Sequence, residues 1–433
     1  MVCVSKNVLT LISVFVITIA MVTHAYAKNE DAQDKGAETL RQALLQGDPE
    51  LRLRYRYGNI EQDNKPKESD ASTLRAMLKY ATKPLYGFSV VGQLRTVQRI
   101  GGAYNDGLNN QTDRPVEPDP DSFEIDQLYA QYEGLNQTKA SIGRRKLKLN
   151  NQRFISDLGW RQNNRSFDGV VVENSGLAED LYLLYSYTRN VNRALTDDAV
   201  KGNFDEADIH MLHGEYKFAP WAELIGYSYL LGIEEDSFAG ASDLATNTYG
   251  ANFKGERALG TSLTALYDFE YAHQDDNEDN SNSFSLDYYR IDLGARYQGL
   301  TLKGGHEVLE GDGNLGFSAP LGLLHAFNGF ADQFTNTPAD GLEDSYAKAT
   351  YKLQSAPVDI AGYDVFGNTT FHLAYHEFDA ENTDQDYGTE WNSFISKKIT
   401  DNYTLRFDYA NFDSQDGFST DTDKFWVSMI ARF

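Results

Sequence analysis

The chain has 433 residues, a net charge of −25 and a single cysteine, Cys3. This acidic balance argues against nucleic acid as a partner, because no basic face of the size that a phosphate backbone needs is visible in the sequence. One cysteine supports neither a disulfide framework nor a cysteine metal site, and we expect no metal and no cofactor.

The N-terminal residues 1–27 have the layout of a secretory signal peptide. Lys6 precedes an apolar run over residues 8–22, and Ala25 and Ala27 are the small residues that a signal peptidase requires. A run of about 15 apolar residues is shorter than the ~20 of a membrane-spanning helix. We therefore predict cleavage after Ala27 and export through the secretory pathway.

Residues 28–49 form a short segment of a different kind. Residues 37–45 favour a helix, and Gly47 is a plausible stop. We predict a short periplasmic helix ahead of the first strand, with entry into a barrel lumen as a plug as the alternative.

From residue 50 to residue 433 short segments alternate apolar and polar residues. The chain contains 27 Tyr and 24 Phe but no second long apolar helix, as in a barrel whose strands face lipid on one side and water on the other. About eighteen segments can be marked, with sixteen as an alternative. They begin near Leu51, Ser72, Tyr86, Phe123, Thr138, Phe167, Asp180, Glu206, Trp221, Ser242, Thr261, Phe284, Leu300, Leu342, Asn368, Thr389, Asn402 and Asp423. The sequence predicts an all-β, transmembrane antiparallel β-barrel.

The connections between these segments alternate in length. Short turns such as Ala219-Pro220 and Gln298-Gly299 alternate with long polar loops such as 99–122, 145–166 and 311–341. Short periplasmic turns and long outer loops are typical of outer-membrane barrels. We predict a protein of the bacterial outer membrane that contacts its lipids and lipopolysaccharide.

The last segment alternates Phe425, Val427, Met429, Ala431 and Phe433 on one face. A terminal aromatic residue that closes such a strand resembles the assembly signal of outer-membrane proteins. We therefore expect the barrel-assembly machinery to be a partner.

The same alternation separates lipid-facing from lumen-facing residues. In the first strand Leu51, Leu53 and Tyr55 face lipid, so that the arginines between them face the lumen. Lumen-facing basic residues predicted in this way are Arg52, Arg54, Arg56, Arg75, Lys79, Arg95, Arg99, Arg145, Arg290, Arg296 and Arg406. A guanidinium group is permanently charged and matches a carboxylate bidentately. The pattern indicates an anion-conducting wall. The alternative is that these arginines pair with Asp268, Glu270, Asp292 and Asp408 and stiffen the wall.

Two long loops differ from the rest, which are acidic. Residues 144–165 carry one carboxylate among many cations, namely Arg144, Arg145, Lys146, Lys148, Arg153, Arg161 and Arg165. Residues 318–334 are apolar and aromatic and include His325 and Phe327, a composition too apolar for a free surface loop. We predict that the first loop narrows the pore and that the second supplies rings for stacking on a sugar. The alternative for both is packing between loops outside the pore.

Several short motifs resemble those of the alginate export family of outer-membrane porins. They are Leu51-Arg52-Leu53-Arg54-Tyr55, Ile142-Gly143-Arg144-Arg145, Asn150-Asn151-Gln152-Arg153-Phe154, Gly159-Trp160-Arg161-Gln162-Asn163, Phe167-Asp168-Gly169-Val170, His325-Ala326-Phe327-Asn328-Gly329-Phe330-Ala331-Asp332 and Asp421-Thr422-Asp423-Lys424-Phe425-Trp426. The resemblance implies an eighteen-stranded barrel with an electropositive pore suited to polyuronate. It carries over Arg52, Arg54, Arg144, Arg145, Arg153 and Arg161 as possible pore residues.

The function expected from these patterns is a passive channel, not an enzyme, for anionic solutes such as acidic, uronate-type oligo- or polysaccharides. A general small-solute porin and a receptor or adhesin with a blocked pore are the alternatives. An outer-membrane protease or lipase is the enzyme-class alternative, since catalytic residues can lie on different strands of a barrel.

Overall fold

The computed structural model describes residues 36–196, 199, 202–355, 359–360, 363–364 and 366–433, so the predicted signal segment lies outside the described residues. Eighteen antiparallel strands form one sheet. The sheet closes on itself because β1 (Asp48–Gln62) pairs with both β2 (Ser69–Ala81) and β20 (Thr422–Arg432). This closed barrel confirms the predicted fold class and strand number.

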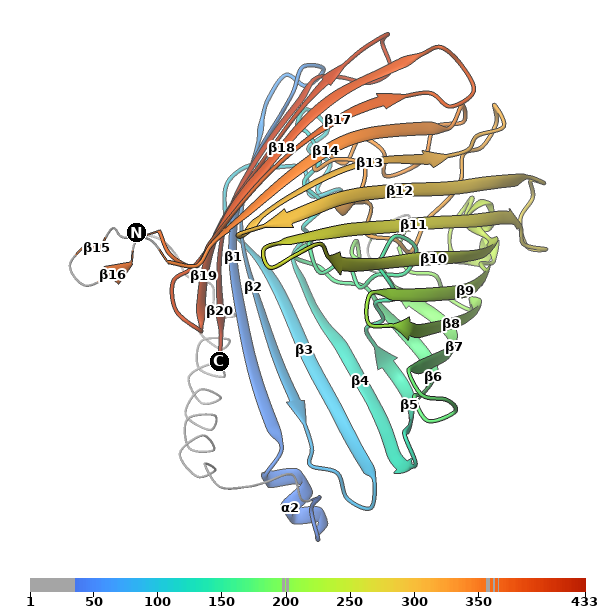
Figure 1. The fold of residues 1–433 in the computed structure, drawn as a ribbon, viewed down its shortest axis with the longest axis vertical. Coiled ribbons are helices and arrows are strands. Elements are labelled where there is room, and N and C mark those ends of the chain that lie inside the picture. The colour runs from blue at the N-terminus through green and yellow to red at the C-terminus, as the bar shows by residue number, and fades with distance from the viewer. Residues whose placement is uncertain (1–35, 197–198, 200–201, 356–358, 361–362, 365) are drawn as a thin grey trace.

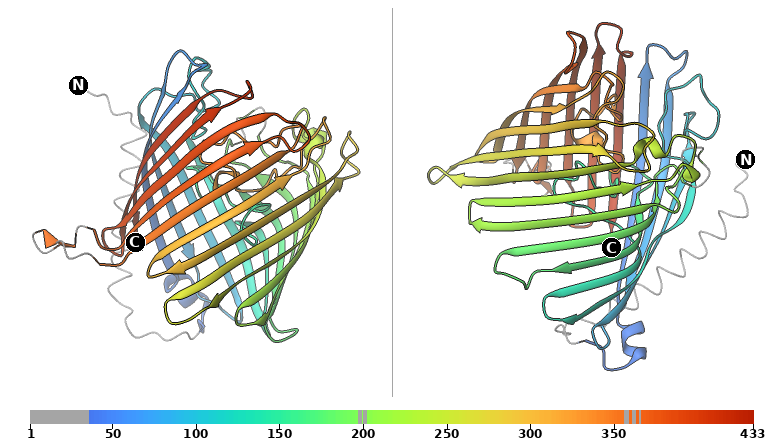
Figure 2. Two further views of the ribbon diagram at one scale, coloured as in Figure 1. Left: turned by 45° about the horizontal axis from the view of Figure 1, so that its top comes forward. Right: turned by 90° about the vertical axis from the view of Figure 1, so that its right-hand side faces the viewer.

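The remaining strands follow one another around the ring in chain order (Figures 1 and 2). They are β3 (Phe88–Gly101), β4 (Ser122–Leu135), β5 (Thr138–Arg145), β6 (Ser166–Asn174), β7 (Leu181–Asn192), β8 (Asp208–Ala219), β9 (Ala222–Gly232), β10 (Thr246–Ala258), β11 (Leu263–Asp276), β12 (Ser285–Tyr297), β13 (Leu300–Leu309), β14 (Leu342–Leu353), β17 (Thr369–Asp379), β18 (Asp386–Lys398) and β19 (Tyr403–Ser414). The short strands β15 (Asp359–Ile360) and β16 (Tyr363–Asp364) pair with each other in the connection between β14 and β17.

The burial pattern of the strands explains why the sheet closes. In β20 the side chains of Lys424, Trp426 and Ser428 are buried inside, whereas Phe425 and Met429 between them are exposed on the outer surface. Exposed apolar rows of this kind suit a lipid environment, and closure leaves no unpaired strand edge within it. No helix in the described part of the chain is long and apolar enough to cross a membrane.

The helix α2 (Leu40–Leu45) precedes the barrel and lies at its short-turn end (Figure 1). Thr39 and Gln42 form a capping box at its start. The helix rests on the β2–β3 turn, where Lys83 N donates to Ala43 O at 3.1 Å and Tyr80 Oη donates to Leu44 O at 2.6 Å. α2 therefore lies outside the lumen and does not act as a plug. Three single-turn 3-10 helices lie in the long loops, η1 (Glu235–Ser237), η2 (Ser242–Leu244) and η3 (Leu324–Ala326).

Candidate functional site

The basic loop, residues 146–165 between β5 and β6, crosses the interior of the barrel. Asn151 Nδ2 donates to Glu270 Oε2 of β11 at 2.6 Å, and Gln162 Oε1 accepts from Arg54 Nε of β1 at 2.8 Å. Because β1 and β11 lie on different sides of the closed ring, a loop that contacts both runs through the lumen. This position agrees with the predicted inward folding of the loop.

The aromatic loop, residues 310–341 between β13 and β14, also enters the lumen and is attached to several strands. Asn328 Nδ2 donates to Glu307 Oε2 of β13 at 2.6 Å, and Ala331 N donates to Glu390 Oε1 of β18 at 2.8 Å. Gly329 has a φ of 86° and lies against the Glu390 carboxylate, where no Cβ would fit. The loop is thereby attached to β13 and to β18, and β18 lies three strands from β1 around the ring.

The two loops meet inside the lumen, beside β1 and β20. The rings of Trp160 and His325 stack with their centroids 3.9 Å apart, Arg161 Nη2 lies 3.8 Å from Asp332 Oδ2, and Ser156 N donates to Leu321 O at 2.9 Å. We call the four residues Trp160, Arg161, His325 and Asp332 the partition.

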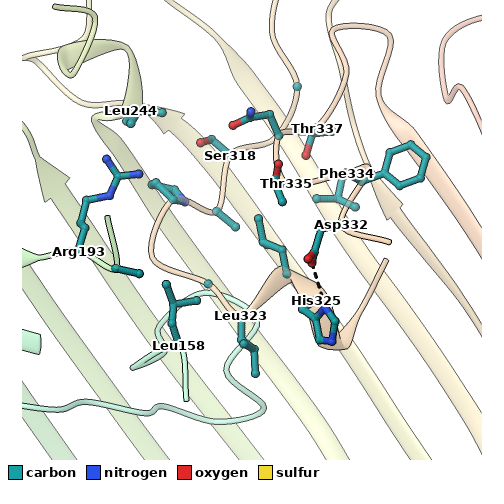
Figure 3. A pocket seen from close by; sticks show the side chains of 18 of the residues that line it. Leu158, Arg193, Leu244, Ser318, Leu323, His325, Asp332, Phe334, Thr335 and Thr337 are labelled. Carbon is teal, nitrogen blue, oxygen red and sulfur yellow. Dashed lines mark hydrogen bonds and ion pairs between the residues drawn. The ribbon is translucent and has the colours of Figure 1, made fainter. Parts of the chain in front are cut away.

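The charges in the partition are set by burial and by close partners. His325 Nδ1 lies 3.0 Å from Asp332 Oδ1 (Figure 3). Burial lowers the pKa of His325, and the nearby carboxylate only partly opposes this. Burial alone would raise the pKa of Asp332, but its contact with His325 and the positive charges of Lys424 and Arg161 hold it well below its usual range. The carboxylate is therefore ionised and binds the loops together.

Two cavities lie on either side of the partition. The outer chamber, of about 540 Å³, lies among the long loops (Figure 3). The inner chamber, of about 330 Å³, lies toward the short-turn ends of β14, β17, β18 and β19. Trp160, Leu323 and His325 line both chambers. The stack of Trp160 on His325 is thus the wall between them.

The arginines of β1 and β2 face the lumen but lie beneath the basic loop. Arg54 and Arg75 are direct cross-strand partners, and both are less than a tenth exposed. Their guanidinium groups donate to backbone carbonyls of the loop, Arg54 Nη1 to Gly159 O at 3.2 Å and Arg75 Nη1 to Arg161 O at 3.2 Å. Arg56 Nη2 likewise donates to Trp160 O at 2.9 Å. These side chains hold the loop, and a solute in either chamber does not reach them.

Other predicted lumen arginines pair with carboxylates, as in the alternative derived from the sequence. Arg95 Nε lies 3.1 Å from Asp126 Oδ1, and Arg406 Nη2 lies 2.6 Å from Asp408 Oδ1. Arg290 is surrounded by three carboxylates, those of Asp268, Glu270 and Asp292.

Three further strand arginines stand apart from the partition. Arg52 pairs with Glu50 and is 45% exposed near the end of β1. Arg145 Nη1 lies 3.1 Å from Glu173 Oε2. Arg144 binds Asp168 and lies opposite Leu128, which is exposed on the outer surface. Neighbouring residues of a strand face opposite sides, so Arg144 faces outward and Arg145 faces the lumen. The predicted place of Arg144 in the pore is therefore wrong.

Arg153 of the basic loop and Phe327 of the aromatic loop lie against each other. Arg153 Nε is 3.0 Å from Glu307 Oε1, and its guanidinium lies 5.0 Å from the centroid of the Phe327 ring. Arg153 is 1% exposed, so it supports the loops from within.

Sequence reasoning did not single out Arg193 or Lys348. Arg193 lines the outer chamber together with Arg161 and Arg165. Lys348 lines the inner chamber, and the alternation of β14, in which Asp344, Tyr346 and Lys348 share a face, is the signal that could have identified it. No group of three or more potential ligands for a metal ion occurs among the described residues.

The barrel with two inward loops has the architecture of an outer-membrane channel. Acinetobacter baumannii OccAB4 is 16% identical with a TM-score of 0.67, and the match covers 93% of this chain and 100% of that one. Pseudomonas aeruginosa OpdK is also 16% identical, with a TM-score of 0.66 and coverage of 89% and 98%, and OpdL is 14% identical, with a TM-score of 0.65 and the same coverage. No curated protein sequence matches the chain.

A family model described as alginate export matches residues 64–417. The chain therefore belongs to the alginate export family, as its motifs predicted. Family and fold together place the protein in the bacterial outer membrane and indicate a channel rather than an enzyme.

Proposed function

We propose that the protein is a passive channel that favours anionic solutes, with uronate-type oligo- or polysaccharides such as alginate as the substrate class. The charge balance of the outer chamber carries this proposal. Its lining contains four arginines, Arg153, Arg161, Arg165 and Arg193, but only two carboxylates, Asp243 and Asp332. Arg153 is paired with Glu307, so the excess positive charge rests on the other three arginines. The chain as a whole has a charge of −25, so composition does not explain this excess.

Arg165 shows why the chamber stays positive. Burial lowers the pKa of Arg165 to about 9, so the guanidinium remains protonated at neutral pH. Its guanidinium donates to two carbonyl oxygens, Ser156 O at 3.4 Å and Pro320 O at 3.0 Å. These neutral partners leave its charge uncompensated, and a solute carboxylate supplies the compensation. Weak sites of this kind allow an anion to enter and to leave again.

The test is the reversal potential of the purified protein in a planar bilayer under a KCl gradient, repeated with oligouronates. We expect anion preference and block by oligouronate. The double variant Arg161→Gln with Arg165→Gln should lose most of this preference, whereas the control Arg52→Gln should keep it. Cation preference in the native protein would refute the proposal.

A receptor with a blocked pore is the second candidate, because the partition separates the two chambers. Absence of conductance in the native protein, with calcium-dependent binding to the acidic outer loops, would favour it. Conductance without any preference for anions or block by oligouronate would instead indicate a general small-solute porin.

A further inference from the structure

The inner chamber has a lining unlike that of the rest of the lumen. Among the described residues that line it none carries a carboxylate, although the chain contains 64 acidic and 39 basic residues. Two cations, Lys348 and Arg406, and the rings of Phe327, Phe330, His372 and Phe394 form much of its surface. This chamber therefore combines positive charge with flat apolar faces.

Lys348 is the cation available to a ligand. Its ammonium lies 3.9 Å from the centroid of the Tyr346 ring, and it makes no hydrogen bond or ion pair with any residue that the structure describes. Arg406, by contrast, is already paired with Asp408. A half-buried ammonium without a counter-ion favours the arrival of an anion.

A second polar group in the lining lacks a partner. Asn392 Oδ1 accepts a hydrogen bond from Phe330 N at 3.1 Å, which fixes the orientation of the amide. Its Nδ2 is buried and has no partner among the described residues. Because a buried donor without an acceptor is unfavourable, an acceptor atom on a ligand would stabilise this side of the chamber.

The rings of the chamber form a nearly parallel series with one wider interval. Trp160 and His325 are 3.9 Å apart, His325 and Phe330 are 4.7 Å apart, and His372 and Phe394 are 4.8 Å apart. Phe330 of the aromatic loop and His372 of β17 are 6.4 Å apart, with an angle of 24° between their planes. A flat ring between two parallel rings needs roughly 7 Å, which is two van der Waals contacts. The interval between Phe330 and His372 is shorter than that, so a ligand ring would pack on the faces that this series turns to the chamber and not between two of its members.

We propose that the inner chamber is a binding site for a monocyclic aromatic carboxylate. The aromatic ring packs against Phe330 and His372, the carboxylate faces Lys348, and Asn392 Nδ2 donates to an acceptor atom of the ligand. A sugar acid fits less well, because its ring is not flat and its hydroxyl groups would meet apolar rings in place of hydrogen-bond partners. The site lies on the short-turn side of the partition and goes beyond the saccharide channel proposed above.

The test is equilibrium binding to the full-length protein in detergent. Binding is measured by calorimetry and by the change in tryptophan fluorescence, since Trp160 lines the chamber. The probes are benzoate, benzamide as a ring without charge, acetate as a charge without a ring, and glucuronate as a non-aromatic acid. We expect benzoate to bind at least about tenfold more tightly than the other three, because each of them lacks one of the two kinds of contact.

Lys303 provides a matched control for Lys348. The two lysines are direct cross-strand partners on β13 and β14, but only Lys348 lines the inner chamber. Lys348→Met should weaken benzoate binding about tenfold, whereas Lys303→Met, which removes the same charge one strand away, should change it less than about threefold. A second variant, His372→Leu, should abolish the preference of the site for benzoate over acetate.

Equal weakening by the two lysine variants would overturn the proposal, as would equal binding of benzoate and glucuronate. Binding in detergent does not depend on ion selectivity. A native protein without anion preference in the bilayer would therefore refute the saccharide channel and leave this site intact. Failure of benzoate to bind selectively would refute this site and leave the saccharide channel intact.

Discussion

The indole of Trp160 and the imidazole of His325 lie face to face, with 15° between their planes, although the two residues belong to different loops. The guanidinium of Arg56 lies 4.2 Å from the centroid of the same indole, and Phe330 stacks on the imidazole. The passage between the chambers is therefore closed by non-covalent contacts alone.

Removal of the indole should open this passage. Stacked aromatic pairs contribute about 0.5–1.5 kcal/mol beyond their buried area, and Trp160→Ala removes this contact together with the cation–π contact to Arg56. We expect a higher single-channel conductance in planar bilayers. Trp221→Ala is the control, because Trp221 is exposed in the β8–β9 turn. An unchanged conductance in Trp160→Ala would mean that the passage lies elsewhere.

Acidification should also loosen the partition. The folded-state pKa of His325 is lowered by burial, so its contribution to stability is complete above its ordinary pKa of about 6.5 and is lost as the pH falls below that value. Channel recordings between pH 8 and pH 5 should show more frequent fluctuations at the acid end. In the His325→Gln variant the frequency of fluctuations should not change between pH 8 and pH 5. If the native protein and this variant responded alike, another group would be responsible.

The arginines beneath the basic loop should affect the loop rather than ion selectivity. Arg75→Met removes one of the two guanidinium donors to the Arg161 carbonyl, the other being Arg54, and loss of a hydrogen bond to a charged group costs about 1.5–3 kcal/mol. We expect noisier conductance with an unchanged reversal potential. Arg52→Met, which removes an exposed guanidinium from the end of β1, should alter neither quantity. A shift of the reversal potential in Arg75→Met without added noise would instead show that Arg75 acts directly on ions.

The stability of the barrel should depend strongly on Arg290, which lies among three carboxylates. Arg290→Met leaves Asp268, Glu270 and Asp292 without their shared cation, and breaking a buried pair of this kind costs about 3–5 kcal/mol.

Arg296 lies on the same strand and pairs with Glu256, but both side chains are about half exposed. Arg296→Met should therefore cost no more than about 1 kcal/mol. The difference in the free energy of unfolding is measured by titrating both variants with urea and detecting the folded fraction by its heat-modifiable migration on gels. Similar midpoints for the two variants would contradict the role of burial.

The strands were predictable because their signals are local. Alternation and turn residues placed a segment at each of the eighteen strands, and Thr389, Asn402 and Asp423 mark strands that the structure contains. The inward course of the two unusual loops was also predictable, because residues 318–334 are too apolar for an outer surface.

The partners of the lumen residues were not predictable, because they lie far away in the sequence. Arg54 bonds to Gln162, which is 108 positions further along the chain. Alternation assigns a side chain to a face but does not show whether a loop covers it. The placement of Arg144 in the pore came from the loop composition and the family motif, whereas alternation assigned only its neighbour Arg145 to the lumen.

The attachment of the two loops links permeability to biogenesis. The basic loop is fastened to β1, whereas the aromatic loop is fastened to β18 and, through Gln333 and Thr422, to β20. The first and last strands of the chain must be joined before both loops have their anchors. Before β1 and β20 pair, these anchors lie on opposite edges of an open sheet, so the contact between Trp160 and His325 forms only when the barrel closes.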